Sequence, residues 1–302
     1  MPIRDIFLAI LVPIILGFGF VIAKPAMDQL PPILLNGLRW SLSGMIMCWF
    51  FPFPKKLFKS LLIISLLGST LQYSLTFSGL NIVDATSATL LIQCEMPFGI
   101  LIAFFILKEK PSLKNLLGLL IAFIGIILLT GSPDLQDKLF GVFLLLSGGF
   151  LWAFAQVIAK PVSEKIGGLA LTAWIGVFAG PASIFLSYFI EGNTYQYIVN
   201  TDLKVWIIVI YLGLVMNCLG YSIWYYVLSK HPVNYVMPVM LLFPVTGLIT
   251  AIFVLGETPS TYAYFGGFII ITGVAIILIN KRKCILQNRY FCHLNHTTRG
   301  IN

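Results

Sequence analysis

Charged residues are scarce in this sequence. They make up 10% of the 302 residues, whereas 59% are hydrophobic and the mean hydropathy is +0.96. A typical soluble domain has about a quarter of its residues charged. So few charges cannot cover the water-facing surface of a chain this long, which excludes a soluble globular protein. The composition therefore predicts an integral membrane protein with the lipid bilayer as its main surroundings.

Cysteine and histidine are also scarce, with five and three residues. Neither occurs in a metal-binding spacing such as CxxC or HExxH, and no histidine falls in the middle of an apolar run. This pattern argues against a disulfide framework and a metal centre. A glycine-rich nucleotide-binding loop is absent too. We therefore expect that the protein binds no metal and no cofactor and that it is not an enzyme. An intramembrane enzyme is disfavoured because a nucleophile paired with a base is also lacking.

The net charge of +8 does not indicate nucleic-acid binding, because the basic residues are spread over short loops rather than gathered on one helix face.

What the chain does contain is an internal repeat. The pentapeptide Val-Ile-Ala-Lys-Pro occurs at 21–25 and again at 157–161. Further matches are displaced by 148 positions: Leu107, Glu109, Pro111, Ser112, Gly118 and Gly125 recur as Leu255, Glu257, Pro259, Ser260, Gly266 and Gly273. The chain is a tandem duplication. In a chain this hydrophobic, duplication favours a transporter over an enzyme.

Apolar runs long enough to cross a bilayer recur along both halves, since a crossing needs about 20 residues. The first half has them near 5–23, 32–51, 59–78, 84–107 and 114–131, and the second near 139–159, 167–190, 204–228, 233–255 and 262–280. These runs are too long and continuous for barrel strands, so an all-α protein with ten transmembrane helices is expected. The expected domains are a first repeat over 5–131, a second over 139–280 and a cytosolic tail over 281–302.

Lysine and arginine predict the orientation. With a cytosolic N-terminus, fifteen of these residues fall in inner segments and only Lys24, Lys138 and Lys204 in outer ones. Both termini are therefore expected in the cytosol. Five helices per repeat is an odd number, so the second repeat enters the membrane from the opposite face. Two inverted repeats of this kind share a site near the membrane midplane.

The sequence resembles the drug/metabolite transporter superfamily, in particular proteins with two EamA-type domains. The residues that carry the resemblance are Pro31-Pro32, Asn36-Gly37-Leu38-Arg39-Trp40, Pro97, Leu107-Lys108-Glu109, Pro244 and Leu255-Gly256-Glu257. Within the superfamily, Leu90-Leu91-Ile92-Gln93 is most similar to bacterial exporters of amino acids and O-acetylserine or cysteine. The resemblance implies export of a small polar metabolite across the bacterial inner membrane. Uptake of a nucleotide-like or scavenged metabolite is the alternative.

Arg39 and Glu95 are the formal charges placed deep inside the predicted helices. Intramembrane charges usually face a cavity or a partner. One interpretation is that they bind the carboxylate and ammonium of a zwitterion, directly or by opening an ion pair between them. A second is a structural ion pair between helices two and four. A third makes Glu95 a proton carrier, which an Arg39 partner would oppose by lowering the pKa of the carboxyl.

Amides and aromatic residues at similar depth complete the predicted substrate site. The remaining substrate-binding candidates are Gln72, Gln93, Gln156, Trp152, Asn217 and Tyr221, with Tyr73, Thr76 and Trp224 near them. An amide facing lipid is costly, which favours an inward position for Gln93, Gln156 and Asn217. Lipid-facing packing is the alternative for each aromatic residue. Pro97 and Pro244 interrupt corresponding helices and are predicted hinges, with a fixed bend as the alternative.

The glycine pairs Gly118/Gly125 and Gly266/Gly273 each fall on one helix face and predict close packing of helices five and ten. That packing is either within the chain or across a homodimer contact. Glu109 and Glu257 stand at helix ends before Pro-Ser, and we interpret them as end anchors rather than ligands.

Overall fold

A computed structural model describes residues 2–107, 113–192, 194–231 and 237–276. All regular secondary structure in these ranges is helical. Glu109 and the predicted tail lie outside the described residues, as do the first residues of the ninth apolar run.

Helices occupy each of the ten apolar runs, within the ranges just given. The first half contains α1 (Ile3–Ala26), α2 (Pro32–Met47), η1 (Cys48–Phe50), η2 (Lys55–Leu57), α3 (Phe58–Ser65), η3 (Leu66–Leu71), α4 (Gln72–Ile82), α5 (Ala85–Leu91), η4 (Ile92–Cys94), α6 (Glu95–Leu107) and α7 (Leu113–Thr130). The second contains α8 (Pro133–Gln136), α9 (Leu139–Ile166), α10 (Gly168–Ile190), α11 (Thr194–Asn200), α12 (Leu203–Ile210), η5 (Tyr211–Tyr221), α13 (Ser222–Lys230), η6 (Met237–Leu241), α15 (Leu242–Leu255) and a last helix, Thr261–Ile276.

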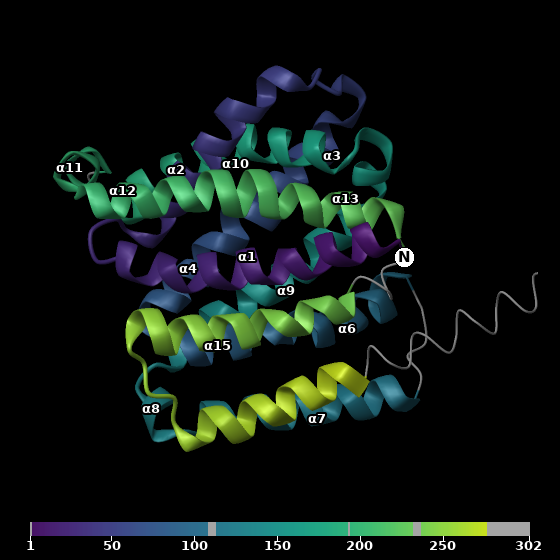
Figure 1. Ribbon diagram of the computed structural model, residues 1–302, viewed down its shortest axis with the longest axis vertical. Helices are drawn as coiled ribbons and strands as arrows, with labels where there is room; N and C mark the ends of the chain where they lie inside the picture. The colour runs from purple at the N-terminus through teal and green to yellow at the C-terminus, as the bar shows by residue number, and fades with distance from the viewer. Residues whose placement is uncertain (1, 108–112, 193, 232–236, 277–302) are drawn as a thin grey trace, which may run out of the picture.

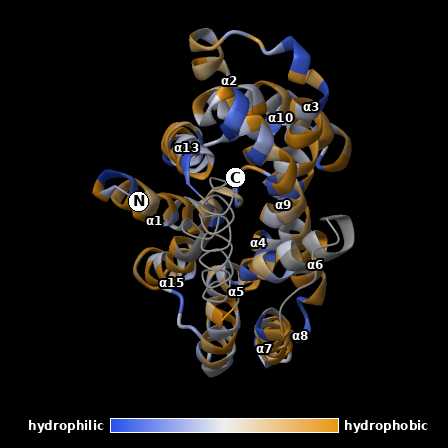
Figure 2. Cartoon of the chain, turned by 90° about the vertical axis from the view of Figure 1, so that its right-hand side faces the viewer, coloured by the Kyte–Doolittle hydropathy of each residue, from blue (hydrophilic) through white to orange (hydrophobic). Residues whose placement is uncertain are grey.

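Length and hydropathy identify five clear membrane-spanning candidates among these helices. They are Ile3–Ala26, Lys55–Ile82, Leu139–Ile166, Gly168–Ile190 and Leu203–Lys230. Shorter apolar helices cover Leu116–Thr130, Val239–Leu255 and Thr261–Ile276. Large hydrophobic side chains stand out from several helices, as at Phe253 and Phe268, and hydrophobic residues colour much of α7, α10 and α15 in Figure 2. The chain is therefore a helical, multi-pass membrane protein.

The helices run across the long axis of the molecule and are stacked side by side along it (Figure 1). The α2–α10 pair with α3 occupies one end, and α7 with the last helix occupies the other. Between them α4 packs on α9, and α1 packs on α15. The helices of the two halves are thus interleaved in one bundle.

Three pairs of corresponding helices pack against each other in opposite directions. The end of α10 meets the start of α2, where the Glu191 carboxylate accepts hydrogen bonds from the backbone N–H groups of Ile33 and Leu34. The end of α15 meets the start of α5 in the same manner through Glu257. Near the other end of the molecule, α7 and the last helix also run antiparallel. There Gly125 lies against residues 266–270, while Gly273 lies against residues 118–122. The glycine faces predicted to pack do meet within the chain.

A close backbone approach joins α2 to α10. A Cβ added at Gly44 would lie 2.5 Å from the backbone of Gly176 and Val177, and one added at Gly180 would lie 2.5 Å from the backbone nitrogen of Ser41. Small residues allow helices in a membrane to approach to this distance, where backbone contacts replace side-chain packing. The α2–α10 contact therefore holds the two halves together at one end of the bundle.

We predict that Gly44→Ala destabilises the protein by about 1–3 kcal/mol, the usual cost of overpacking, because backbone rather than a flexible side chain blocks the new methyl group. The matched control is Gly99→Ala in α6, where an added Cβ meets nothing within 4 Å. There the helix propensity of alanine should leave stability unchanged or slightly higher. Thermal unfolding in detergent compares the two. Equal melting temperatures would contradict the importance of this contact.

Two kinds of irregular turn interrupt the helices, at corresponding places in both halves. The segments η3 and η5 are π-helical, and each precedes a regular helix of the same apolar run. The segments η4 and η6 are 3₁₀ turns, and each ends three residues before a proline, Pro97 or Pro244. Proline lacks an N–H donor and its ring clashes with the carbonyl four residues earlier, which accounts for an irregular turn just before it. The interruptions predicted from Pro97 and Pro244 are present.

Two carboxylates cap helices across the two halves. Glu257 accepts hydrogen bonds of 2.8 and 2.9 Å from the N–H groups of Ala85 and Thr86, another of 2.9 Å from the Thr86 hydroxyl, and lies 3.6 Å from the Lys24 ammonium. Burial alone would raise the pKa of Glu257, but these donors and Lys24 outweigh it and lower the pKa below its usual value. Glu257 is an end anchor, as predicted.

Glu191 makes the equivalent contact without a described cation beside it. Its carboxylate accepts hydrogen bonds of 2.7 and 2.9 Å from the N–H groups of Ile33 and Leu34, and one of 2.7 Å from the Ser187 hydroxyl. Burial outweighs these hydrogen bonds and raises the pKa of Glu191 above its usual value. The two anchors therefore respond to pH in opposite directions.

We predict opposite pH dependences for Glu257→Gln and Glu191→Gln. Since the folded pKa of Glu257 is depressed, its ionised form stabilises the protein above the unfolded value of about 4.3, and this contribution is lost as pH falls through the folded pKa. Glu257→Gln should therefore lower the melting temperature near neutrality and less in acid. The folded pKa of Glu191 is raised, so its ionisation lowers stability as pH rises from the unfolded to the folded value. Glu191→Gln should remove that loss. Melting curves between pH 3 and 7 test both, and parallel profiles would contradict the assignment.

Candidate functional site

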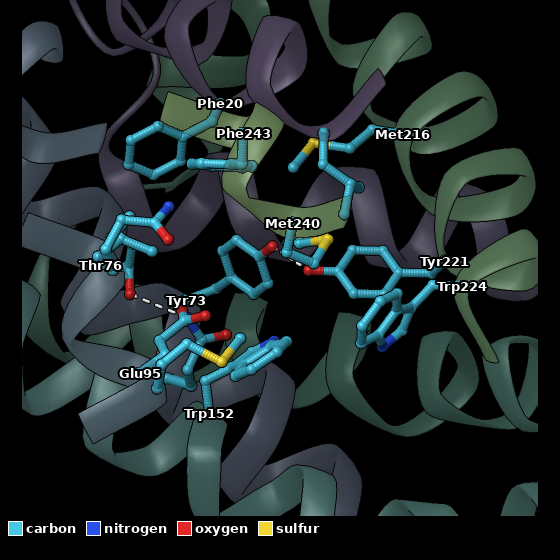
Figure 3. Close-up of a pocket in the computed structure, with 15 residues that line it drawn as sticks. Phe20, Tyr73, Thr76, Glu95, Trp152, Met216, Tyr221, Trp224, Met240 and Phe243 are labelled. Carbon is cyan, nitrogen blue, oxygen red and sulfur yellow. Dashed lines mark hydrogen bonds between the residues drawn. The ribbon is translucent and has the colours of Figure 1, made fainter. Parts of the chain in front are cut away.

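A pocket lies in the middle of the bundle, between helices of both halves. It encloses about 40 Å³, enough for a few water molecules. Its walls are formed by Leu16, Phe20, Gln72, Tyr73, Thr76, Ile92, Gln93, Glu95, Met96, Trp152, Met216, Tyr221, Trp224, Met240 and Phe243 (Figure 3). The irregular turns η4, η5 and η6 each contribute residues to it, so the pocket is built where the regular helices are interrupted. Side chains must move before a metabolite can enter.

Two tyrosines from corresponding helices meet beside this pocket. The hydroxyl groups of Tyr73 and Tyr221 are hydrogen-bonded to each other, and the two rings point toward one another in Figure 3. Their positions differ by 148 residues, the displacement that relates the two repeats. The flanking residues agree, because Leu71 and Ser74 recur as Leu219 and Ser222. This recurrence is the sequence signal that could have predicted their contact.

Arg39 on α2 is completely buried, and polar contacts hold its guanidinium in place. Its Nε and Nη2 each donate to the Asn36 side-chain oxygen at 3.1 Å. Longer contacts of 3.4 Å join Nη1 to the Asn217 side-chain oxygen and to the Met216 sulfur. Asn36 in turn donates to the Ser69 carbonyl and the Ser183 hydroxyl, which fixes the amide that receives Arg39.

Aromatic rings surround the same guanidinium. Its central carbon lies 3.8 Å from the ring centre of Tyr73, 4.7 Å from that of Phe77 and 5.6 Å from that of Trp40. A cation over an aromatic face gains electrostatic stabilisation, more so where water is excluded. Because Tyr73 lines the pocket and Arg39 does not, the Tyr73 ring lies between the cation and the pocket.

The ion pair considered between Arg39 and Glu95 does not form. Ion pairs among the described residues join Lys24 to Glu257 and Lys160 to Glu164, and a hydrogen bond joins Asp5 to His231. Similar depth in the membrane does not place two side chains on facing helix surfaces, and Arg39 instead points to Asn36 and Tyr73. The argument that Arg39 keeps the pKa of Glu95 low therefore does not apply to this conformation.

Glu95 and three further polar side chains line one side of the pocket. Gln72 donates to the Thr76 hydroxyl at 2.9 Å, while its side-chain oxygen is buried and has no partner among the described residues. Gln93 also lines the pocket. The Glu95 carboxylate makes neither an ion pair nor a hydrogen bond within the described ranges, although Gly149 of α9 packs against its stem. A carboxylate and an unpaired amide oxygen therefore face the same space, where an ammonium group would satisfy both.

Two indole rings also line the pocket (Figure 3). Trp152 and Trp224 come from the sixth and eighth apolar runs, and their ring centres are 6.3 Å apart. Gln156 accepts a 3.4 Å hydrogen bond from the Trp224 indole N–H, so it supports this wall from behind. Asn217 lies with Arg39, outside the pocket, and its side-chain nitrogen is buried without a described partner.

The structure thus brings five of the predicted substrate-binding residues into one pocket, namely Gln72, Gln93, Glu95, Trp152 and Tyr221. Arg39, Gln156 and Asn217 stand directly behind its wall. Sequence reasoning missed the apolar lining, such as Phe20, Met216 and Phe243, because one apolar residue among many in a span carries no distinguishing signal. It also missed Asn36, although a spacing of three residues from Arg39 places both on one helix face.

A polar and aromatic pocket at the centre of an apolar helical bundle is the arrangement of a multi-pass membrane transporter. The model of the EamA-like transporter family matches this chain twice, over residues 3–131 and 139–279, and the chain belongs to that family.

Relatives and one solved structure agree with this assignment. A probable amino-acid metabolite efflux pump of Salmonella typhimurium is 30% identical over 92% of this chain and 96% of its own length. The protein of the same description in Escherichia coli is 28% identical over the same shares. A crystal structure with 16% identity superposes with a TM-score of 0.66, covering 91% of this chain and 97% of its own, which shows a common fold. The chain is a transporter and not an enzyme.

Proposed function

We propose that this protein exports an amino acid or a related zwitterion from the cytosol of a bacterium by alternating access. Its ten helices would span the inner membrane as two inverted five-helix repeats, 5–131 and 139–280, with both termini in the cytosol. The observation that carries the proposal is the central pocket, which takes residues from both halves and holds the unpaired Glu95 carboxylate. Two relatives described as probable amino-acid metabolite efflux pumps support the substrate class.

The antiparallel pairing of corresponding helices supports the inverted arrangement. A two-fold axis in the membrane plane would relate each helix to its counterpart in the other half and bring helices near the axis into antiparallel contact, as α2 contacts α10 and α7 contacts the last helix. Such an axis places the shared site near the bilayer midplane. The fifteen basic residues in predicted inner segments, against three in outer ones, support cytosolic ends.

The substrate would be held between the polar and aromatic walls. The ammonium group binds Glu95 with the free oxygen of Gln72, and the side chain of the substrate packs on Trp152 and Trp224. Pro97 and Pro244 serve as hinges, because each follows a turn that contributes pocket residues, Gln93 in η4 and Met240 in η6. Bending at these turns would open one side of the pocket and then the other.

Cells that express the protein should release more cysteine, O-acetylserine or another amino acid than cells with an empty vector. We expect Glu95→Gln to reduce this excess about tenfold or more, because hydrogen bonds to a charged group contribute about 1.5–3 kcal/mol. The control is Glu164→Gln, which removes an exposed carboxylate that pairs with Lys160 on α9. Metabolite profiling of the medium at matched membrane levels provides the measurement.

If export persists in Glu95→Gln, Glu95 contributes to helix packing and not to substrate binding. An unchanged medium, with the wild-type protein inserted, would overturn export and favour metabolite uptake.

Fusions to alkaline phosphatase, which is active outside the cytoplasm, should reveal the orientation. A fusion after residue 138 should be active, and one at the C-terminus should be inactive. A fluorescent protein at the C-terminus should fluoresce. The reverse pattern would overturn the proposed topology, and equal activities would contradict the odd number of crossings in the second repeat, which separates the two fusion sites.

A further inference from the structure

Arg39 is a strong anion-binding group that its surroundings satisfy only in part. It is fully buried, and the acceptors that it contacts are neutral: one amide oxygen at 3.1 Å, and a second amide oxygen and a sulfur at 3.4 Å. None of the described carboxylates pairs with it. A guanidinium presents a planar set of donors that matches a carboxylate with two parallel hydrogen bonds. Arg39 therefore retains the capacity for such a ligand.

Asn217 provides a second, independent donor at the same place. Its side-chain oxygen faces Arg39, while its side-chain nitrogen is buried and has no partner in the described part of the chain. A buried amide N–H without an acceptor is destabilising. A carboxylate that bound the Arg39 guanidinium would bring an acceptor to this nitrogen too.

Tyr73 separates these donors from the pocket. One face of its ring covers the guanidinium at 3.8 Å, and the residue also forms part of the pocket wall. Its hydroxyl is bound to that of Tyr221, which also lines the pocket (Figure 3). Each tyrosine comes from a different half of the chain. A relative movement of the halves would thus act directly on this hydrogen bond.

We propose that the Tyr73–Tyr221 pair is a movable partition between the pocket and a carboxylate-binding subsite formed by Arg39 and Asn217. This inference rests on the proposed function, in which Glu95 receives the ammonium group of the same substrate. When the tyrosines part, the substrate carboxylate replaces the Tyr73 ring at Arg39. Hydrogen bonds to ionised groups are about twice as strong as neutral ones, so the exchange of a Tyr–Tyr bond for Arg–carboxylate bonds favours the open partition.

The subsite defines a substrate class. An α-amino acid carries both charges that the site recognises, whereas the amine that lacks its carboxylate carries only the charge for Glu95. An amine of this kind would leave the partition closed and Arg39 covered. The protein should therefore prefer amino acids to the corresponding amines, and Arg39 should be the origin of that preference.

Counterflow in proteoliposomes tests this with two matched pairs of radiolabelled probes, cysteine with cysteamine and serine with ethanolamine. Wild-type protein should exchange the amino acid in preference to the amine. Arg39→Gln should reduce this preference about tenfold or more by raising the KM for the amino acid alone, and Arg39→Lys should retain part of it. Melting temperatures in detergent identify any variant that does not fold.

The tyrosines provide the second arm. Tyr73→Phe and Tyr221→Phe keep both rings but delete the hydrogen bond that holds the partition closed. A closed partition lowers the apparent affinity, because only the fraction of molecules with an open partition can bind the carboxylate. Each Tyr→Phe variant should therefore lower the KM for the amino acid about fivefold and leave the KM for the amine unchanged. Tyr211→Phe is the control, since Tyr211 lies in the same π-helical segment as Tyr221 but its hydroxyl donates to the Ile15 carbonyl of α1, away from the pair.

The outcomes separate the two proposals. In one outcome, Glu95→Gln loses transport of both probes, while the Arg39 and tyrosine variants affect the amino acid and the amine equally. That result would overturn the proposed partition and leave the proposed export function intact. The absence of exchange with any probe in the wild type would overturn the proposed substrate class, and the subsite with it.

Discussion

Inside a membrane, every backbone N–H and C=O group has to find its partner within the protein, because lipid offers none. The architecture of this chain depends on that constraint. Where α2 and α5 begin, carboxylates from the other half accept hydrogen bonds from the free N–H groups of the first turn. Glu191 does so for α2 and Glu257 for α5. Where Pro97 and Pro244 interrupt the ladder, the irregular turns contribute to the central pocket rather than to the lipid-facing surface.

The contacts between the halves differ in kind, and the difference determines what can move. At the α2–α10 contact, backbone lies directly on backbone at Gly44 and Gly176, with no flexible side chain to absorb a displacement. At the centre, the two halves meet through a hydrogen bond between neutral hydroxyl groups, Tyr73 to Tyr221, and through the 3.4 Å contacts of Arg39 with Asn217 and Met216. Close-packed surfaces resist sliding, whereas one neutral hydrogen bond is easily exchanged. Rearrangement is therefore easier at the pocket than at the end of the bundle.

Periodic and local features of the fold could be predicted from the sequence. Apolar runs located the helices, glycine spacing indicated the contact of α7 with the last helix, and prolines marked the interrupted turns. The ion pair between Arg39 and Glu95, one of the alternatives considered, is absent from this conformation, because depth along two helices says nothing about the direction in which each side chain points. The caps formed by Glu191 and the aromatic cage of Arg39 join residues far apart in sequence. Such contacts follow from tertiary packing, which periodicity does not encode.

The site departs from the symmetry of the duplicated chain at two positions, Glu95 in the pocket and Arg39 behind its wall. Tyr73 and Tyr221 are equivalent and meet as such, but alignment of Pro97 with Pro244 places Leu242 at the position of Glu95. A fully symmetric pocket would hold a small molecule equally well in two opposite orientations. With one carboxylate and one guanidinium, both in the first half, those two orientations differ in energy. The duplication thus supplies a scaffold with equivalent halves, and in the proposed site the loss of equivalence at these two positions would give a bound molecule a defined head and tail throughout its passage.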